Sequence, residues 1–168
     1  MIKKKGLIKK LEAAKILYIL HEHKPLFTVN DSEKMRGEIQ GVHTKNLFLK
    51  NKKNEYFLFS CSEHQSINLK KLGKSLVSGN LSFAKKNDLK KYLYVFPGSV
   101  TPFGLLNDIE NKVNFFLDKN LTQNDKINFH PLINTSTITI KAQDFINFLL
   151  ENKKKINIFD FNTYILIK

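Results

Sequence analysis

The chain of 168 residues is 42% hydrophobic and carries a net charge of +13, a composition that excludes an intrinsically disordered protein and allows one sizeable core. The positive charge favours a polyanionic partner such as nucleic acid, because clustered cations release condensed counterions from phosphates, but a compositional bias towards lysine is an alternative origin of this charge. Only one of the 28 basic residues, Arg36, is an arginine, so lysines would contact phosphates as point charges.

The first predicted element is an amphipathic helix. Leu7, Leu11, Ala14 and Tyr18 follow the spacing of one helical face. The helix is expected to continue to the stretch "HEHKP", where Pro25 would end it.

The sequence also indicates the cellular compartment in which the protein works. Lys9, Lys10 and Glu12 interrupt the apolar stretch that a signal peptide would need, and no apolar run approaches the ~18 residues of a membrane span. Cys61 is the only cysteine, so an intramolecular disulfide is impossible and a reducing compartment is the default. We predict a cytoplasmic protein with no membrane partner.

Strands dominate the next segment. "LFTV", residues 26–29, predicts a short strand, and the Asp-Ser pair that opens residues 31–35 could cap a brief helix. "KNLFL", residues 45–49, and "EYFLFSC", residues 55–61, read as two strands joined by a polar loop. They predict a hairpin.

Helical signals follow the hairpin. Asn68 is a plausible cap for a helix that carries Leu69, Leu72 and Leu76 on one face. A further short helix is predicted over residues 89–93.

The C-terminal half returns to strands. Strands are predicted at residues 113–118, 127–131 and 136–140, and a closing helix over residues 142–155. Helices at both ends around a mixed, mostly antiparallel sheet predict an α+β fold, with one domain over residues 1–168.

The stretch "FPGSVTPFGLLND", residues 96–108, is a candidate anion site. Pro97-Gly98 is a strong turn signal, and Gly98 permits a positive φ that would let successive backbone N–H groups converge on an anion or a developing oxyanion. The alternative is an ordinary turn. The spacing of a P-loop is absent.

A second candidate lies in "HTKNLFLK", where Lys45 and Asn46 immediately precede the apolar run Leu47 to Leu49. Most lysines of the chain must be solvated surface cations. A lysine at the start of a strand, however, has its direction set by the burial just beyond it and could project over a cleft. Asn46 could hydrogen-bond a loop or a ligand through its amide.

Other constellations are less specific. His130, before Pro131, could act as a general base or a pocket wall, or serve as a structural histidine. A triad of Ser99 or Thr101 with His130 and Asp118 can be imagined, but the G-x-S-x-G motif is missing. Asp108 and Asp118 could form a catalytic pair or simply cap turns.

Metal ligands are sparse. His21 and His23, two residues apart at the predicted helix end, would face different directions, and "CSEH" offers only Cys61 and His64. We expect no metal site.

Six longer motifs, in this order and spacing, carry a family resemblance: "HTKNLFLKNKK", "SGNLSFA", "PGSVTPFGLLND", "FFLDKNL", "NFHPLINTSTITI" and "DFINFLL". They resemble the bacterial trans-editing Ala-tRNA(Pro) deacylases called ProXp-ala, or PrdX, of the YbaK and prolyl-tRNA synthetase editing-domain superfamily. The resemblance runs from about His21 to Phe161.

The resemblance implies hydrolysis of the ester between alanine and the terminal ribose of tRNA(Pro), without a cofactor, a metal or a covalent nucleophile. It implies catalytic roles for Lys45, Gly98 and Asn46, which would hold the aminoacyl end. The expected substrate-binding residues are His130, Ser99, Val100, Thr101, Pro102 and Phe103, with Phe27 and Thr28 near the entrance.

The implied partners are the acceptor end of tRNA(Pro) and prolyl-tRNA synthetase, and we expect a monomer. Two alternatives stay open. One is a deacylase of the same fold that acts on another small amino acid, serine or cysteine, or on another tRNA. The other is a basic RNA-binding module without catalysis.

Overall fold

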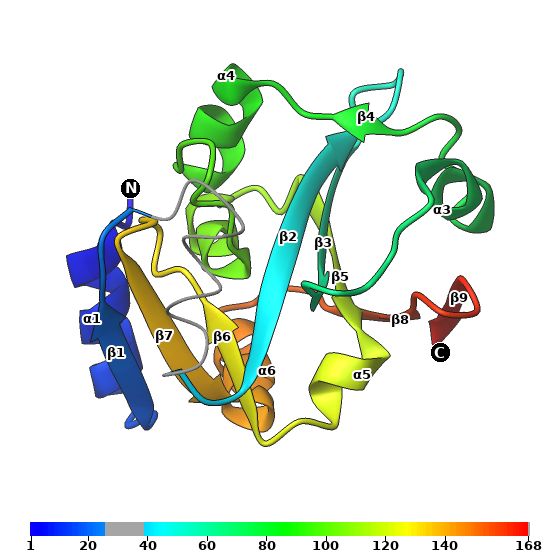
Figure 1. The fold of residues 1–168 in the computed structure, drawn as a ribbon. Helices are drawn as coiled ribbons and strands as arrows, with labels where there is room; N and C mark the ends of the chain where they lie inside the picture. Colours follow the sequence, from blue (N-terminus) through cyan, green and yellow to red (C-terminus); the bar gives the residue numbers. More distant parts are fainter. Residues whose placement is uncertain (26–38, 168) are drawn as a thin grey trace.

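A mixed sheet with helices on both faces forms the framework in this computed structural model, which describes residues 1–25 and 39–167 (Figure 1). The helical elements are α1 (Lys4–Ala13), α3 (Leu69–Ser75), α4 (Lys86–Asp88), η1 (Leu89–Leu93), η2 (Pro102–Asn107), α5 (Lys119–Thr122) and α6 (Ala142–Glu151). The strands are β1 (Tyr18–Glu22), β2 (Val42–Lys50), β3 (Tyr56–Ser62), β4 (Ser82–Phe83), β5 (Val113–Asp118), β6 (Lys126–Phe129), β7 (Ser136–Lys141), β8 (Asn157–Asp160) and β9 (Ile165–Ile167).

The strand order of this sheet is β1-β7-β6-β2-β3-β5-β8-β9, with β4 paired to β2 beside that path. Within the described chain, β2–β6, β3–β5 and β5–β8 are parallel and the other pairs are antiparallel. The prediction of an α+β fold with a mixed, mostly antiparallel sheet is confirmed.

Two hydrophobic clusters lie on opposite faces of the sheet, because neighbouring side chains of a strand point to opposite sides. Phe48 and Leu58 belong to the first cluster, whereas the next residues, Leu49 and Phe59, belong to the second. Helices α1, α6, η1 and η2 contribute to the first cluster and α3 to the second.

The N-terminal helix is shorter than predicted. It ends in a Schellman motif, in which the Lys15 N–H donates to the Glu12 carbonyl and the Ile16 N–H to the Leu11 carbonyl. Lys15 takes the left-handed conformation that this motif needs, with φ of 56°. The chain therefore leaves the helix long before the proline, and Tyr18–Glu22 form strand β1 against β7.

Most other predicted elements are confirmed. The β2–β3 hairpin is present, and the Asn68 side chain caps α3 by accepting from the Lys71 N–H at 3.0 Å. The predicted end of the last helix is wrong, because α6 stops at Glu151. Two further strands follow, β8 and β9, which are too short to show a pattern in the sequence. The strand expected at residues 26–29 and the helix at 31–35 lie outside the described residues.

The edge of β2 that faces β6 has an opening. Pairing with β6 covers only Val42 and His43, and pairing with β4 begins again at Leu49. Over residues 44–47, none of the described strands pairs with this edge, while the other edge is paired to β3 throughout. In the described part of the chain, this stretch of β2 therefore has a strand neighbour on one side only.

Helices capable of spanning a membrane do not occur among the residues that the structure describes.

Candidate active site

Lys45 lies on β2 at this open edge, opposite Cys61 of β3. Its side chain is half-buried, and its Nζ has no hydrogen-bond or ion-pair partner in residues 1–25 and 39–167. Burial raises the pKa of the Cys61 thiol to about 12, and the charge of Lys45 opposes that shift. Cys61 is therefore no thiolate nucleophile at neutral pH.

Asn46 leaves β2 on the opposite face from Lys45. It pairs with Ser60, whose Oγ donates to Asn46 Oδ1 at 2.6 Å. The resemblance implies that Lys45 and Asn46 both hold the aminoacyl end, yet the two side chains leave the strand on opposite faces, because adjacent strand residues alternate. A ligand can contact both only at the edge of the strand, and this edge is unpaired there.

The predicted Pro97-Gly98 turn is confirmed. The Ser99 N–H donates to the Phe96 carbonyl at 3.0 Å, and Gly98 has φ of +85°, as the third residue of a type II turn requires. A Cβ added to Gly98 would lie 3.6 Å from Asn134 Nδ2, so the turn sits against the loop that follows β6.

The turn leaves two backbone donors unused. The N–H groups of Gly98 and Val100 donate to no acceptor in the described part of the chain, whereas the Ser99 N–H closes the turn. Two N–H groups on one tight loop can bind an anion or an oxyanion.

The rest of this loop is held in the core. Thr101 is fully buried and caps η2, since its Oγ1 accepts from the Phe103 N–H at 3.4 Å. Phe103 is also fully buried and packs edge-on against Phe129, Phe145 and Phe148. Phe103 thus anchors the loop rather than facing a ligand.

His130 follows the last residue of β6, next to the loop that contacts Gly98. Its Nδ1 lies 2.8 Å from the Ser136 carbonyl, which can only accept, so Nδ1 carries the proton and Nε2 of the neutral ring is an acceptor. Burial is the main cause that lowers the pKa of His130, and the charge of His23 lowers it further. The His130 ring is therefore neutral at pH 7, and its Nε2 can accept a hydrogen bond.

Sequence reasoning missed His23 as a neighbour of His130. The two ring centroids are 6.1 Å apart, and His23 Nε2 lies 2.9 Å from Thr137 Oγ1. His21 reaches Thr139 in the same way at 3.0 Å. The prediction that His21 and His23 face different directions is wrong, because they follow the two-residue period of a strand, not a helix.

A polar network links this histidine group to β2. Thr139 Oγ1 donates to Asn128 Oδ1 at 2.6 Å, and Thr44 Oγ1 donates to the Asn128 carbonyl at 2.7 Å. In the parallel register of β2 and β6, His43 lies beside Asn128. The pairing of β2 with β6 ends there, and His130 follows directly after the last residue of β6.

The hypothetical triad and carboxylate pair do not assemble. Asp118 caps α5 by accepting from the Asn120 N–H at 3.0 Å, and His130 Nδ1 is bound to Ser136 instead. Burial raises the pKa of Asp118. The Asp108 carboxylate accepts hydrogen bonds from the Lys112 N–H and from the Val113 N–H at the start of β5. Asp108 therefore stabilises a turn.

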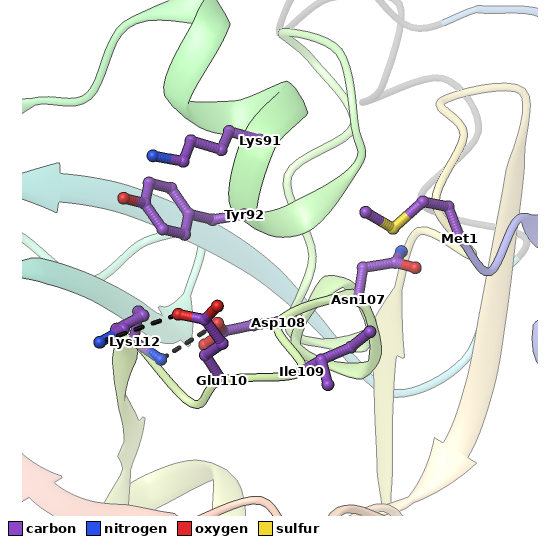
Figure 2. Close-up of a pocket in the computed structure, with 8 residues that line it drawn as sticks. All are labelled: Met1, Lys91, Tyr92, Asn107, Asp108, Ile109, Glu110 and Lys112. Atoms are coloured by element: carbon purple, nitrogen blue, oxygen red, sulfur yellow. Dashed lines mark hydrogen bonds and ion pairs between the residues drawn. The ribbon is translucent and has the colours of Figure 1, made fainter.

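Among residues 1–25 and 39–167, no three His, Cys, Asp or Glu side chains form a group that could bind a metal ion. Phe27 and Thr28 lie outside the described residues. A surface hollow of about 210 Å³, shown in Figure 2, is lined by other residues, among them Lys91, Tyr92 and Glu110.

Comparison with known proteins shows the family of the chain. Residues 23–148 match the family model of the aminoacyl-tRNA editing domain, and this range contains Lys45, Gly98 and His130. The chain belongs to the aminoacyl-tRNA editing domain family. Members of this family are aminoacyl-tRNA hydrolases, so the chain is an editing enzyme.

Two curated relatives and one solved structure show how far the similarity extends. The prolyl-tRNA editing protein ProX of Acetoanaerobium sticklandii is 38% identical over 142 residues, which is 84% of this chain and 87% of that protein. The prolyl-tRNA synthetase associated domain-containing protein 1 of Mus musculus is 37% identical over 133 residues, 76% of this chain and 78% of that protein. A solved structure described as a candidate trans-editing enzyme for prolyl tRNA synthetase shares the fold, with a TM-score of 0.67 and 16% sequence identity. The similarity covers 100% of this chain and 99% of that chain.

Proposed function

We propose that the protein is a trans-editing deacylase that hydrolyses alanine from mischarged tRNA(Pro). The names of the two curated relatives support a prolyl-tRNA substrate. The observation that carries the chemistry is the half-buried side chain of Lys45 on the stretch of β2 where, among the described residues, no strand pairs with the edge facing β6.

In the proposed reaction, water attacks the ester carbonyl and the C–O bond to the terminal ribose breaks. The ribose oxygen leaves with a proton, and alanine leaves as a carboxylate. The Gly98 and Val100 N–H groups are the proposed donors to the tetrahedral oxyanion, and Lys45 holds the ribose and phosphate end. An ester is an activated substrate, so positioning and charge stabilisation serve it better than a strong base.

Selectivity for alanine would come from exclusion. A synthetase pocket shaped for proline cannot reject the smaller alanine strongly, because each missing methylene is worth only ~1 to 3 kcal/mol. A second, narrower pocket can reject proline by steric clash. Here the fixed His130 ring and the Val100 side chain, held by the turn and the buried Phe103, are the proposed walls.

A panel of charged tRNAs tests this proposal. Wild-type protein is incubated with Ala-, Ser-, Cys- and Pro-tRNA(Pro), and loss of the ester is followed over time. We expect Ala-tRNA(Pro) to be cleaved fastest and Pro-tRNA(Pro) to survive. Faster loss of Ser- or Cys-tRNA(Pro) would contradict the choice of alanine, and stability of all four esters would contradict an editing function on this tRNA.

A further inference from the structure

Asn134, in the loop between β6 and β7, is a half-buried side chain without a partner. Neither its amide nitrogen nor its amide oxygen takes part in a hydrogen bond within residues 1–25 and 39–167. A side-chain amide has two N–H donors and one acceptor oxygen, and burying such groups unpaired costs free energy. The unpaired amide is therefore a candidate ligand contact.

The loop itself, residues 130–135, is pinned at three points. At its start, the His130 ring reaches across the loop, and its Nδ1 donates to the Ser136 carbonyl at 2.8 Å. Near its end, the His23 N–H donates to the Thr135 carbonyl at 2.9 Å. Between these contacts, Leu132 packs against the first hydrophobic cluster. The loop therefore presents its free amide from a fixed backbone, as a group that acts on a ligand requires.

The Asn134 amide faces the Gly98 turn. Asn134 Nδ2 is 3.6 Å from the position that a Cβ at Gly98 would occupy, and Oδ1 is farther from it. A Cβ lies about 2.5 Å from the nitrogen of its own residue, so Asn134 Nδ2 and the Gly98 nitrogen are at most about 6 Å apart. Hydrogen bonds of about 2.9 Å from two such donors can meet on one oxygen between them.

The two unused N–H groups of the turn, on Gly98 and Val100, thus have a third free donor beside them. Building on the proposed function, we propose that the Asn134 side-chain amide is a catalytic group that donates to the oxyanion together with these two N–H groups. A neutral amide suits this position, because it stabilises charge that develops in the reaction without adding a buried ion of its own.

The step that Asn134 assists is the attack of water. As the water oxygen bonds to the ester carbon, the π electron pair of the carbonyl moves onto the carbonyl oxygen, where the three N–H groups bind the charge. The pair then returns and the bond to the ribose oxygen breaks. One proton of the water ends on the ribose oxygen and the other in solvent, so that alanine leaves as a carboxylate.

Substitutions test the amide through the turnover of saturating Ala-tRNA(Pro). Asn134→Ala removes the donors, and Asn134→Asp replaces Nδ2 with an oxygen whose charge repels the oxyanion. We expect the rate to fall by about 100-fold or more in both variants, the usual effect of losing one such donor. Asn134→Ala should keep the wild-type tRNA affinity and free energy of unfolding, because its side chain has no partner to lose. A wild-type rate in Asn134→Ala would overturn the proposal.

Asn162→Ala, at an exposed asparagine near the end of β8, is the matched control and should behave as wild type in every assay. The double variant Gly98→Ala with Asn134→Ala adds a second check. Because both changes weaken binding of the same oxyanion, their effects on the rate should not add. Fully additive losses would contradict a shared site.

Two stable mimics distinguish a donor to the oxyanion from a merely structural residue. An alanine phosphonate joined to the 3′ oxygen of adenosine has a charged tetrahedral centre, whereas the amide-linked analogue keeps a flat neutral carbonyl. Asn134→Ala should weaken binding of the phosphonate by about tenfold or more and leave binding of the amide-linked analogue unchanged. Equal changes for both mimics would reject the role of Asn134.

The same measurements separate this inference from the proposed function. If the wild type hydrolyses none of the charged tRNAs while Asn134→Ala still lowers phosphonate binding, the proposed function fails and the anion contact stands. If the wild type cleaves Ala-tRNA(Pro) and Asn134→Ala cleaves it equally fast, only the role of Asn134 is refuted.

Discussion

Lys45 and Asn46, neighbours in the sequence, leave β2 on opposite faces, with Lys45 across from Cys61 and Asn46 bonded to Ser60. Their roles should therefore separate by mutation. Lys45 has no hydrogen-bond or ion-pair partner among residues 1–25 and 39–167, and Asn46 is fixed from the other face by the buried Ser60 hydroxyl.

Replacing Lys45 should abolish most of the chemistry and little of the binding. We expect Lys45→Ala to lower the single-turnover cleavage of Ala-tRNA(Pro) by about 100-fold or more, because an ester held about 1 Å out of place loses rate on that scale, while the affinity for the whole tRNA(Pro) changes only slightly. Lys141→Ala, an exposed lysine on β7, is the control and should behave as wild type. Parallel losses of affinity and rate for Lys45→Ala would instead favour a simple RNA-binding role.

Ser60 should act through Asn46. Ser60→Ala removes a buried 2.6 Å hydrogen bond, so we expect the free energy of unfolding to fall by about 1 kcal/mol and the cleavage rate to fall at unchanged tRNA affinity. Asn46→Ala should lower the rate too, and the double variant should be no slower than Asn46→Ala alone. Additive rate losses in the double variant would show that Ser60 does not position Asn46.

Gly98 and Gly79 form a matched pair. Both have positive φ, +85° and +76°, and an added Cβ would meet only Asn134 Nδ2 at 3.6 Å in the first case and nothing within 4 Å in the second. Alanine at either position should therefore lower the free energy of unfolding by about 1 kcal/mol through backbone strain, as measured by urea unfolding. Cleavage should fall only in Gly98→Ala, where the strained turn displaces the N–H donors. Equal activity in the two variants would argue against an oxyanion role for the turn.

Acid should destabilise the protein through its buried imidazoles. Burial lowers the pKa of both His130 and His21 from an ordinary 6.5. As pH falls through 6.5, the unfolded chain takes up protons that the folded one does not, so the free energy of unfolding decreases, by at most about 1.4 kcal/mol per pH unit for His130 and by less for His21, whose charge is better solvated.

Urea unfolding between pH 7.5 and 5 measures this dependence. His130→Gln should flatten the profile below pH 6.5. A wild-type profile that is flat over this range would contradict the assigned burial of His130.

Sequence pattern was sufficient for much of the fold. The apolar runs of β2 and β3, the alternation in β7, the Asn68 cap and the Pro97-Gly98 turn are local signals, and each depends on a few adjacent residues. The end of α1 was misjudged because a Schellman motif can form around a lysine, which gives no warning in the sequence.

The sequence by itself also determined the family, the positive charge and the candidates Lys45, Gly98 and His130, because residue types and their spacing are carried along the chain. Only the tertiary structure decided that β2 has an open edge, that Lys45 and Asn46 point apart, and that His23 stands beside His130. These relationships depend on pairing between strands that are distant in sequence, and strand register cannot be read from either strand alone.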